Sequence, residues 1–120
     1  STVSHDCHNL TIVYDTPENA LLAANKLIRC CGGMCAERDG RVLCTLELPI
    51  AGLMSPKTAE ELSGSAQAMK ESLRELGLRE IENPLLRIVT LALPVVPELK
   101  VTDMGLVDVL KKEIVPLLID

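Results

Sequence analysis

Two adjacent residues, Asp39 and Gly40, constrain the fold of this chain more than any other feature of its sequence. They separate the stretches Met34–Arg38 and Arg41–Leu48. In the second stretch one set of apolar residues alternates with a second set, which consists of Leu43, Thr45 and Glu47. An Asp-Gly pair suits a two-residue type I′ turn, whose twist matches that of the strands it joins. The sequence therefore predicts a β-hairpin with one buried face. The residues of that face are Val42, Cys44, Leu46 and Leu48.

The hairpin also sets an expectation for the cysteines. If the strands pair in register from the turn, Cys35 lies opposite Cys44 at a Cα separation of about 4.5 Å, short but within disulfide range. The cysteine count is odd and no CxxC pair occurs, so neither a disulfide framework nor a zinc ribbon is indicated. We expect reduced thiols and a reducing, cytoplasmic location. The cysteines are Cys7, Cys30, Cys31, Cys35 and Cys44.

A strand and a helix are expected before the hairpin. Leu10–Tyr14 is rich in β-branched residues and predicts a short strand. Thr16 suits the N-cap of a helix and Pro17 its first position, while Gly32-Gly33 suits its end. The strand, helix and first hairpin strand could form a parallel unit. The expected buried stripe of the helix is Ala20, Ala24, Leu27, Ile28 and Cys31.

Two further helices are expected after the hairpin. An apolar loop, Pro49–Met54, leads to Ser55-Pro56, where the longest helix should start, and Gly77 should stop it. Asn83-Pro84 predicts a cap and first turn of a shorter helix that runs to about Leu93. The longest helix has an apolar seam in steps of three and four. Its members are Ala59, Leu62, Ala66, Met69, Leu73 and Leu76.

The C-terminal third is expected to turn once and end in a strand. Thr102–Gly105 reads as a turn, and Lys112–Ile119 as a closing strand. Pro116 places that strand at a sheet edge or a bulge. With the hairpin and the helices, this predicts one α+β domain over residues 1–120, a mostly antiparallel sheet covered by two or three helices.

Composition excludes several kinds of partner. The 120 residues include 12 Lys and Arg against 17 Asp and Glu, a net charge of -5, which argues against nucleic acid and anionic membranes as partners. The only aromatic residue is Tyr14, so base-stacking platforms are not expected. No apolar run reaches about 18 residues, and no signal peptide is visible.

The densest polar cluster is His5-Asp6-Cys7-His8-Asn9, which contains both histidines of the chain. Histidine and aspartate can ligate metals or transfer protons near neutral pH. HxxH without glutamate is a weak metal signal, and no second cluster supplies further ligands. Three interpretations stay open: hydrogen bonding that caps or cross-links the start of the strand, a role in binding or catalysis, and a metal site within the chain.

Three motifs, in order, resemble one family. Ser4–Leu10 resembles the His-Asp-Ser-His-Asn segment found late in bacterial and archaeal adenine deaminases, with Cys7 in place of the usual Ser. Leu48–Ser55 resembles a second segment of that family. Leu91–Asp103 together with Gly105–Val109 resembles its closing segment. The resemblance covers about residues 4–118, which is nearly the whole chain.

The resemblance implies a part of a larger cytoplasmic hydrolase of purine salvage. Adenine deaminases hydrolyse adenine to hypoxanthine and ammonia with a binuclear centre, typically manganese or iron, held by a (β/α)₈ barrel. The barrel's ligands include a His-x-His pair, which this chain lacks. We therefore expect no metal site here and no deamination by these 120 residues alone, even with added manganese.

For the domain itself, the apolar loop, which needs a cover, and the compact polar cluster indicate packing on the barrel of the same parent chain. The candidates for a wall of the adenine pocket are His5, Asp6, His8 and Asn9. A second hypothesis is an oligomerisation or packing module, with Pro49–Met54 and Leu91–Val96 as its interface and a homo-oligomer as its product. A third is a free-standing ligand-binding protein without catalytic activity.

Overall fold

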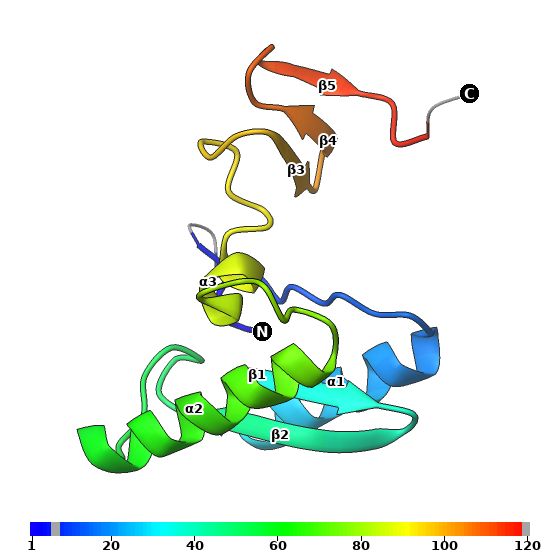
Figure 1. Cartoon of the computed structure of the whole chain (residues 1–120). Coiled ribbons are helices and arrows are strands. Elements are labelled where there is room, and N and C mark those ends of the chain that lie inside the picture. The colour runs from blue at the N-terminus through cyan, green and yellow to red at the C-terminus, as the bar shows by residue number, and fades with distance from the viewer. Residues whose placement is uncertain (6–7, 119–120) are drawn as a thin grey trace.

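A computed structural model describes residues 1–5 and 8–118 of the chain (Figure 1). It has the predicted α+β architecture, with antiparallel strand pairing in both of its sheets. One sheet has the order β1-β2 and the other the order β3-β4-β5. The elements are α1 (Pro17–Arg29), β1 (Gly33–Arg38), β2 (Arg41–Glu47), α2 (Ala59–Glu75), α3 (Pro84–Val89), β3 (Leu99–Thr102), β4 (Gly105–Asp108) and β5 (Glu113–Val115).

The predicted hairpin is confirmed, with one correction to its register. Asp39 and Gly40 both have positive φ, 53° and 73°, as a type I′ turn requires. A β-bulge then places Leu43 outside the pairing, so that Ala36 faces Cys44 and Cys35 faces Thr45. The predicted Cys35–Cys44 pair is therefore wrong, because one extra residue in a strand shifts every pair beyond it. All the cysteines that the structure describes are free.

The start of α1 follows the prediction, and its end differs in detail. The side chain of Thr16 accepts a hydrogen bond from the backbone of Asn19 at 3.3 Å, with Pro17 in the first turn. After Arg29, the backbone N–H of Gly32 donates to Leu27 at 2.8 Å and that of Cys31 to Ile28 at 3.2 Å. This is a Schellman ending. Its left-handed residue is Cys31, at φ 60°, rather than a glycine.

The predicted stripe of α1 is only partly buried. Leu27 is 3% exposed, whereas Ile28 is 71% exposed and Cys31 is also exposed. Successive helical residues point about 100° apart. Only the side of α1 that carries Leu27 therefore packs against the hairpin, and Ile28 lies on the exposed side of the helix.

The long helix α2 begins at Ala59, four residues after the predicted start at Ser55. Thr58 and Glu61 form a capping box there, each side chain bonding the other's backbone N–H, and this satisfies two donors at once. The predicted seam is confirmed at Met69 and Leu73, which are buried, while its first residue, Ala59, is exposed. Met69 and Leu73 form the core with residues of the hairpin and its end, namely Met34, Ala36, Leu46 and Leu48.

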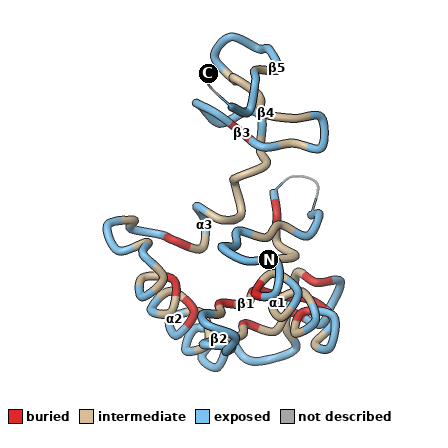
Figure 2. The backbone as a smooth tube through the Cα atoms, turned by 90° about the vertical axis from the view of Figure 1, so that its right-hand side faces the viewer, coloured by how far each residue is buried: buried red, intermediate tan, exposed pale blue. Residues whose placement is uncertain are grey.

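The two long helices cover opposite faces of the hairpin. Leu46 lies in the core beneath α2. Its neighbour Glu47 points the other way and pairs with Lys26 of α1 at 3.2 Å. The short helix α3 packs against α2. It is capped by Asn83 as predicted but ends at Val89 rather than near Leu93. Figure 2 shows the buried residues concentrated between α1, α2 and the hairpin.

The predicted strand Leu10–Tyr14 is wrong, and so is the parallel unit built on it. This segment is irregular. A different part of the N-terminal segment contacts β1: the backbone N–H of Thr2 donates to the carbonyl of Gly33 at 2.9 Å. Strand propensity alone therefore does not give residues 10–14 a partner on β1.

The C-terminal residues form a separate sheet that the sequence predicted only in part. The turn at Thr102–Gly105 is confirmed and joins β3 to β4. The closing strand β5 is shorter than predicted, since it covers Glu113–Val115 and stops before Pro116, which lacks the N–H that a ladder needs. Ile119, the last residue of the predicted strand, lies outside the described residues. Within residues 1–5 and 8–118, no helix is long and apolar enough to cross a membrane.

Candidate functional site

The predicted polar cluster begins at an exposed turn. The backbone N–H of His5 donates to Val89 at the end of α3 at 2.9 Å, and that of His8 donates to Ser4 at 2.6 Å. The two imidazole rings stack with centroids 6.5 Å apart and planes 19° apart. Both histidines are exposed. Asp6, the third candidate, lies with Cys7 outside the described residues.

This turn is held by hydrogen bonds of three hydroxyl groups, those of Ser4, which is buried, and of Thr2 and Thr11, which are half-buried. Ser4 is fully buried, and its Oγ accepts a hydrogen bond from the hydroxyl of Thr11 at 2.8 Å. The Oγ1 of Thr2 donates to the carbonyl of Gly52 at 2.7 Å and accepts from the N–H of Gly33 at 2.8 Å. The bonds of Thr2 connect the N-terminal segment to the hairpin and to the loop 49–54. With the turn held in this way, His5 and His8 are exposed to solvent.

The apolar loop 49–54 is held by backbone hydrogen bonds, while apolar residues of the loop are exposed. Ile50 and Met54 form an isolated antiparallel bridge, while the two residues are 44% and 57% exposed. Gly52 is buried at φ 72°, and a Cβ on the neighbouring Gly32 would collide with its Cα. Glycine at both positions therefore permits the close approach of the loop to the end of α1.

The histidine turn and the apolar loop border one open hollow of about 330 Å³. His8 lines it together with residues of the apolar loop and the end of α1, whereas Asn9 is exposed and is not part of the lining. The sequence placed these two features far apart along the chain, and the fold brings them together. The lining residues are Thr2, His8, Leu10, Ala24, Leu27, Ile28, Cys31, Gly32, Ala51 and Gly52.

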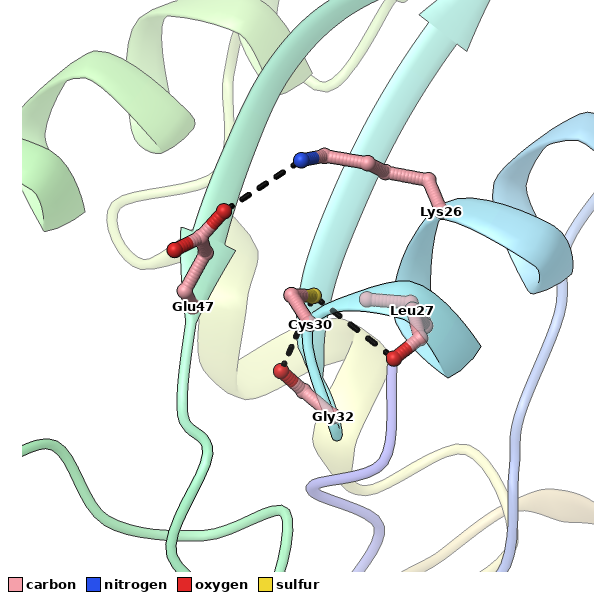
Figure 3. Close-up of polar contacts among 5 residues, drawn as sticks. All are labelled: Lys26, Leu27, Cys30, Gly32 and Glu47. Carbon is pink, nitrogen blue, oxygen red and sulfur yellow. Dashed lines mark hydrogen bonds and ion pairs between the residues drawn. The ribbon is translucent and has the colours of Figure 1, made fainter.

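The helix end beside this hollow is fixed to the hairpin by polar contacts (Figure 3). Lys26 reaches across to Glu47 of β2 at 3.2 Å. The thiol of Cys30 lies 3.6 Å from the carbonyl of Leu27 and 3.4 Å from that of Gly32. Its single proton can serve one of these acceptors at a time. Cys30 therefore helps to close the turn after α1.

A second cavity, of about 400 Å³, lies between residues 11–15, α1, β1 and α2. Glu37 of β1 lines it, and Oε2 of Glu37 is buried without a hydrogen-bond partner among the described residues. Burial raises the pKa of this carboxyl group, and the negative charges of Asp15 and Asp39 raise it further. Burial also raises the pKa of the Cys35 thiol. The raised pKa favours the protonated thiol, which is less reactive than the thiolate.

Sequence reasoning missed Glu37 as a residue of interest. The predicted register pairs Glu37 with Val42 on the expected buried face, but a glutamate beside an Asp-Gly turn usually faces water, so it did not stand out. Only the approach of α1 and of residues 11–15 encloses it. No local signal in the sequence predicts that contact.

The described residues do not fit a binuclear metal centre. Within residues 1–5 and 8–118, no group of three or more His, Cys, Asp or Glu side chains is placed to hold a metal ion. His5 and His8 are the only histidines of the chain, and a closed site needs four ligands. What the site offers instead is an exposed pair of imidazoles beside an apolar hollow.

Comparison with known proteins matches this chain to one family. The sequence profile described as "Adenine deaminase C-terminal domain" matches residues 1–113. An adenine deaminase of Moorella thermoacetica is 48% identical over 118 residues, which cover 98% of this chain. Adenine deaminase 2 of Carboxydothermus hydrogenoformans is 44% identical over 97% of the chain, and an adenine deaminase of Bdellovibrio bacteriovorus is 40% identical over all of it.

In each of these relatives the matched region is a minor part of the protein. The chain spans about 20% of the length of each. The match nevertheless includes the histidine turn, the hairpin, the apolar loop and most of the C-terminal sheet. The chain therefore belongs to the adenine deaminase C-terminal domain family.

Proposed function

We propose that this chain is the C-terminal domain of an adenine deaminase, a part of a longer polypeptide that hydrolyses adenine to hypoxanthine and ammonia. The observation that carries the proposal is the identity of 40–48% to proteins named adenine deaminase, along nearly the whole chain. Manganese or iron would be held by a barrel domain in the remaining four fifths of the polypeptide. We further propose a cytoplasmic location, which the free cysteines of the described chain support, and a role in purine salvage.

Within that enzyme, the histidine turn and the apolar loop would pack on the barrel and wall the adenine pocket. The turn offers two exposed imidazoles that can donate or accept hydrogen bonds. The loop beside it leaves Ile50 and Met54 exposed, and such side chains gain stability when a partner covers them. His8 of the turn and Ala51 and Gly52 of the loop line the same hollow, so one docked partner could cover both segments.

The experiment is to replace His8 by Ala in the full-length polypeptide that carries this chain. Loss of one hydrogen bond to substrate costs about 0.5–1.5 kcal/mol, so we expect kcat/KM for adenine to fall about 2-fold to 10-fold. Metal content and thermal stability should not change, because the His8 side chain is exposed. Asn25→Ala, also exposed, is the control on α1. Unchanged kinetics for His8→Ala would contradict a role in the pocket.

A second candidate function is that of an oligomerisation or packing module. Val95 is 74% exposed and lies in the segment Leu91–Val96, and exposed apolar groups of this kind mark interaction surfaces when they are contiguous. Such a module would form a homo-oligomer of the whole enzyme. The mass of the full-length polypeptide in solution tests this, because a monomer would rule out self-association.

A further inference from the structure

One face of the C-terminal sheet is apolar across all three of its strands. The register pairs Val101 of β3 with Leu106 of β4, and Leu106 with Val115 of β5. Leu99 lies two residues before Val101 and so points to the same side. Leu99 and Val101 are 52% and 60% exposed. We call these four residues, Leu99, Val101, Leu106 and Val115, the sheet face.

No helix of the described chain covers the sheet face, and neither does the β1-β2 hairpin, although Leu106 and Val115 are half-buried. None of the three strands contacts a helix or the β1-β2 hairpin, and the sheet stands apart from the other elements in Figures 1 and 2. The opposite side is different. Lys100, only 7% exposed, points to that side and donates to the carbonyl of Pro97 at 3.4 Å. The segment before β3 therefore contacts the side of Lys100, while Leu99 and Val101 on the sheet face stay exposed.

Such a sheet needs a cover in order to persist. Its strands have four, four and three residues, and small sheets in water depend on burying an apolar face. The ends of the sheet face carry Asp108 and Glu113, but Lys111 lies 3.1 Å from Asp108 and 4.0 Å from Glu113. One lysine balances part of this charge, and the rest of the surface, at Leu99, Val101, Leu106 and Val115, is apolar.

We propose that the sheet face is a docking surface for the preceding part of the same polypeptide. The inference rests on the proposed function, in which four fifths of the enzyme lie outside this chain. Four side chains fall well short of the roughly 800 Å² per partner that a stable interface between separate molecules buries. A tethered segment needs less area, because the linkage already supplies a high effective concentration. This favours a covalently attached partner over a second copy of the chain.

The test is amide hydrogen exchange on the 120-residue chain and on the full-length polypeptide. We expect the β4 amides of Leu106 and Val107 to exchange at least about tenfold more slowly in the full-length polypeptide. Val101→Glu should remove that slowing, because a carboxylate on the sheet face cannot be buried without a partner. Leu21→Glu, the same kind of change at a residue of α1 that is 62% exposed, should leave it intact.

The outcomes separate the inference from the function beneath it. Equal exchange in the two proteins, with adenine turnover intact, would overturn the docking surface and leave the proposed function standing. Slowing that grows with concentration in the 120-residue chain would overturn it in favour of a second copy. Slowing in a full-length polypeptide that does not deaminate adenine would support the docking surface and refute the proposed function. An unchanged melting temperature of the 120-residue Val101→Glu variant shows that it still folds.

Discussion

The two sheets of this chain are built from similar apolar residues but differ in how far those residues are buried. In β1-β2, Met34 and Leu46 are 6% and 7% exposed, because α2 lies over them. In β3-β4-β5, Leu99 and Val101 are more than half exposed, because no helix of the described chain reaches them. Strand residues alone therefore do not decide which sheet is stable. The cover decides it, and one sheet has its cover within the chain.

The largest contrast is expected from truncating one apolar residue in each region. Met69→Ala should destabilise the 120-residue chain by about 2–5 kcal/mol, since Met69 is 1% exposed and its removal leaves a cavity. Val101→Ala should change the unfolding free energy by less than about 0.5 kcal/mol. Urea unfolding measures both. Comparable losses would show that the two sheets share one core.

Glycine substitutions sharpen the comparison at the backbone. Gly33 has φ 134°, and a Cβ there would overlap the carbonyl oxygen of Leu46, so Gly33→Ala should cost about 3 kcal/mol. Gly105, at φ 126°, meets only the Cγ2 of Ile114 at 3.4 Å. Gly105→Ala should strain the β3-β4 turn without lowering the melting temperature of the helical region. A global loss of stability in the second variant would refute this separation.

A smaller effect is expected from the threonines that cap each region. Thr58→Ala removes the capping box of α2 and should cost about 1 kcal/mol in the unfolding transition. Thr102 makes the matching contacts in the other sheet, donating to the carbonyl of Gly105 at 2.9 Å and accepting from Met104 at 3.2 Å. We expect Thr102→Ala to leave that transition unchanged. The denaturation midpoints of the two variants test this.

The smallest effect concerns Glu37 and depends on pH. Its pKa is raised in the folded chain by burial, so the folded state disfavours its charge at pH 7. Stability from this group should rise as pH falls through the raised pKa, because the folded state then binds the proton first. Glu37→Gln should therefore raise the melting temperature at pH 7, and the gain should shrink near pH 4. An equal gain at both pH values would contradict this origin.

Local features of the sequence predicted much of the region that contains α1, α2 and the β1-β2 hairpin. Asp39-Gly40 fixed the turn, and Thr16 and Pro17 fixed the start of α1 through contacts within a few residues. The spacing of Met69 and Leu73 gave the buried side of α2. The shifted register was not predicted: Leu43 is an apolar residue at a polar position of the alternation, but this interruption alone does not show which residue is left unpaired. Residues 10–14 have strand propensity, but whether they pair depends on what else reaches β1.

The candidate site was predicted in its residue types and not in its geometry. The sequence singled out His8 and the loop Pro49–Met54 separately, and the fold brings them to one hollow, where Thr2 is hydrogen bonded to Gly52. Asp6 lies outside the described residues, and its role stays a prediction. Contacts between residues distant in sequence, such as that from Thr2 to Gly52, have no periodic signature along the chain.

Release of ammonia from adenine is the measurement that tests the central claim most directly. The claim is that these residues supply surfaces while the chemistry belongs to the rest of the enzyme. With added manganese, the full-length polypeptide should deaminate adenine and the 120-residue chain should show no turnover above buffer. Clear turnover by the 120-residue chain, or none by an intact and metal-loaded full-length polypeptide, would contradict the account.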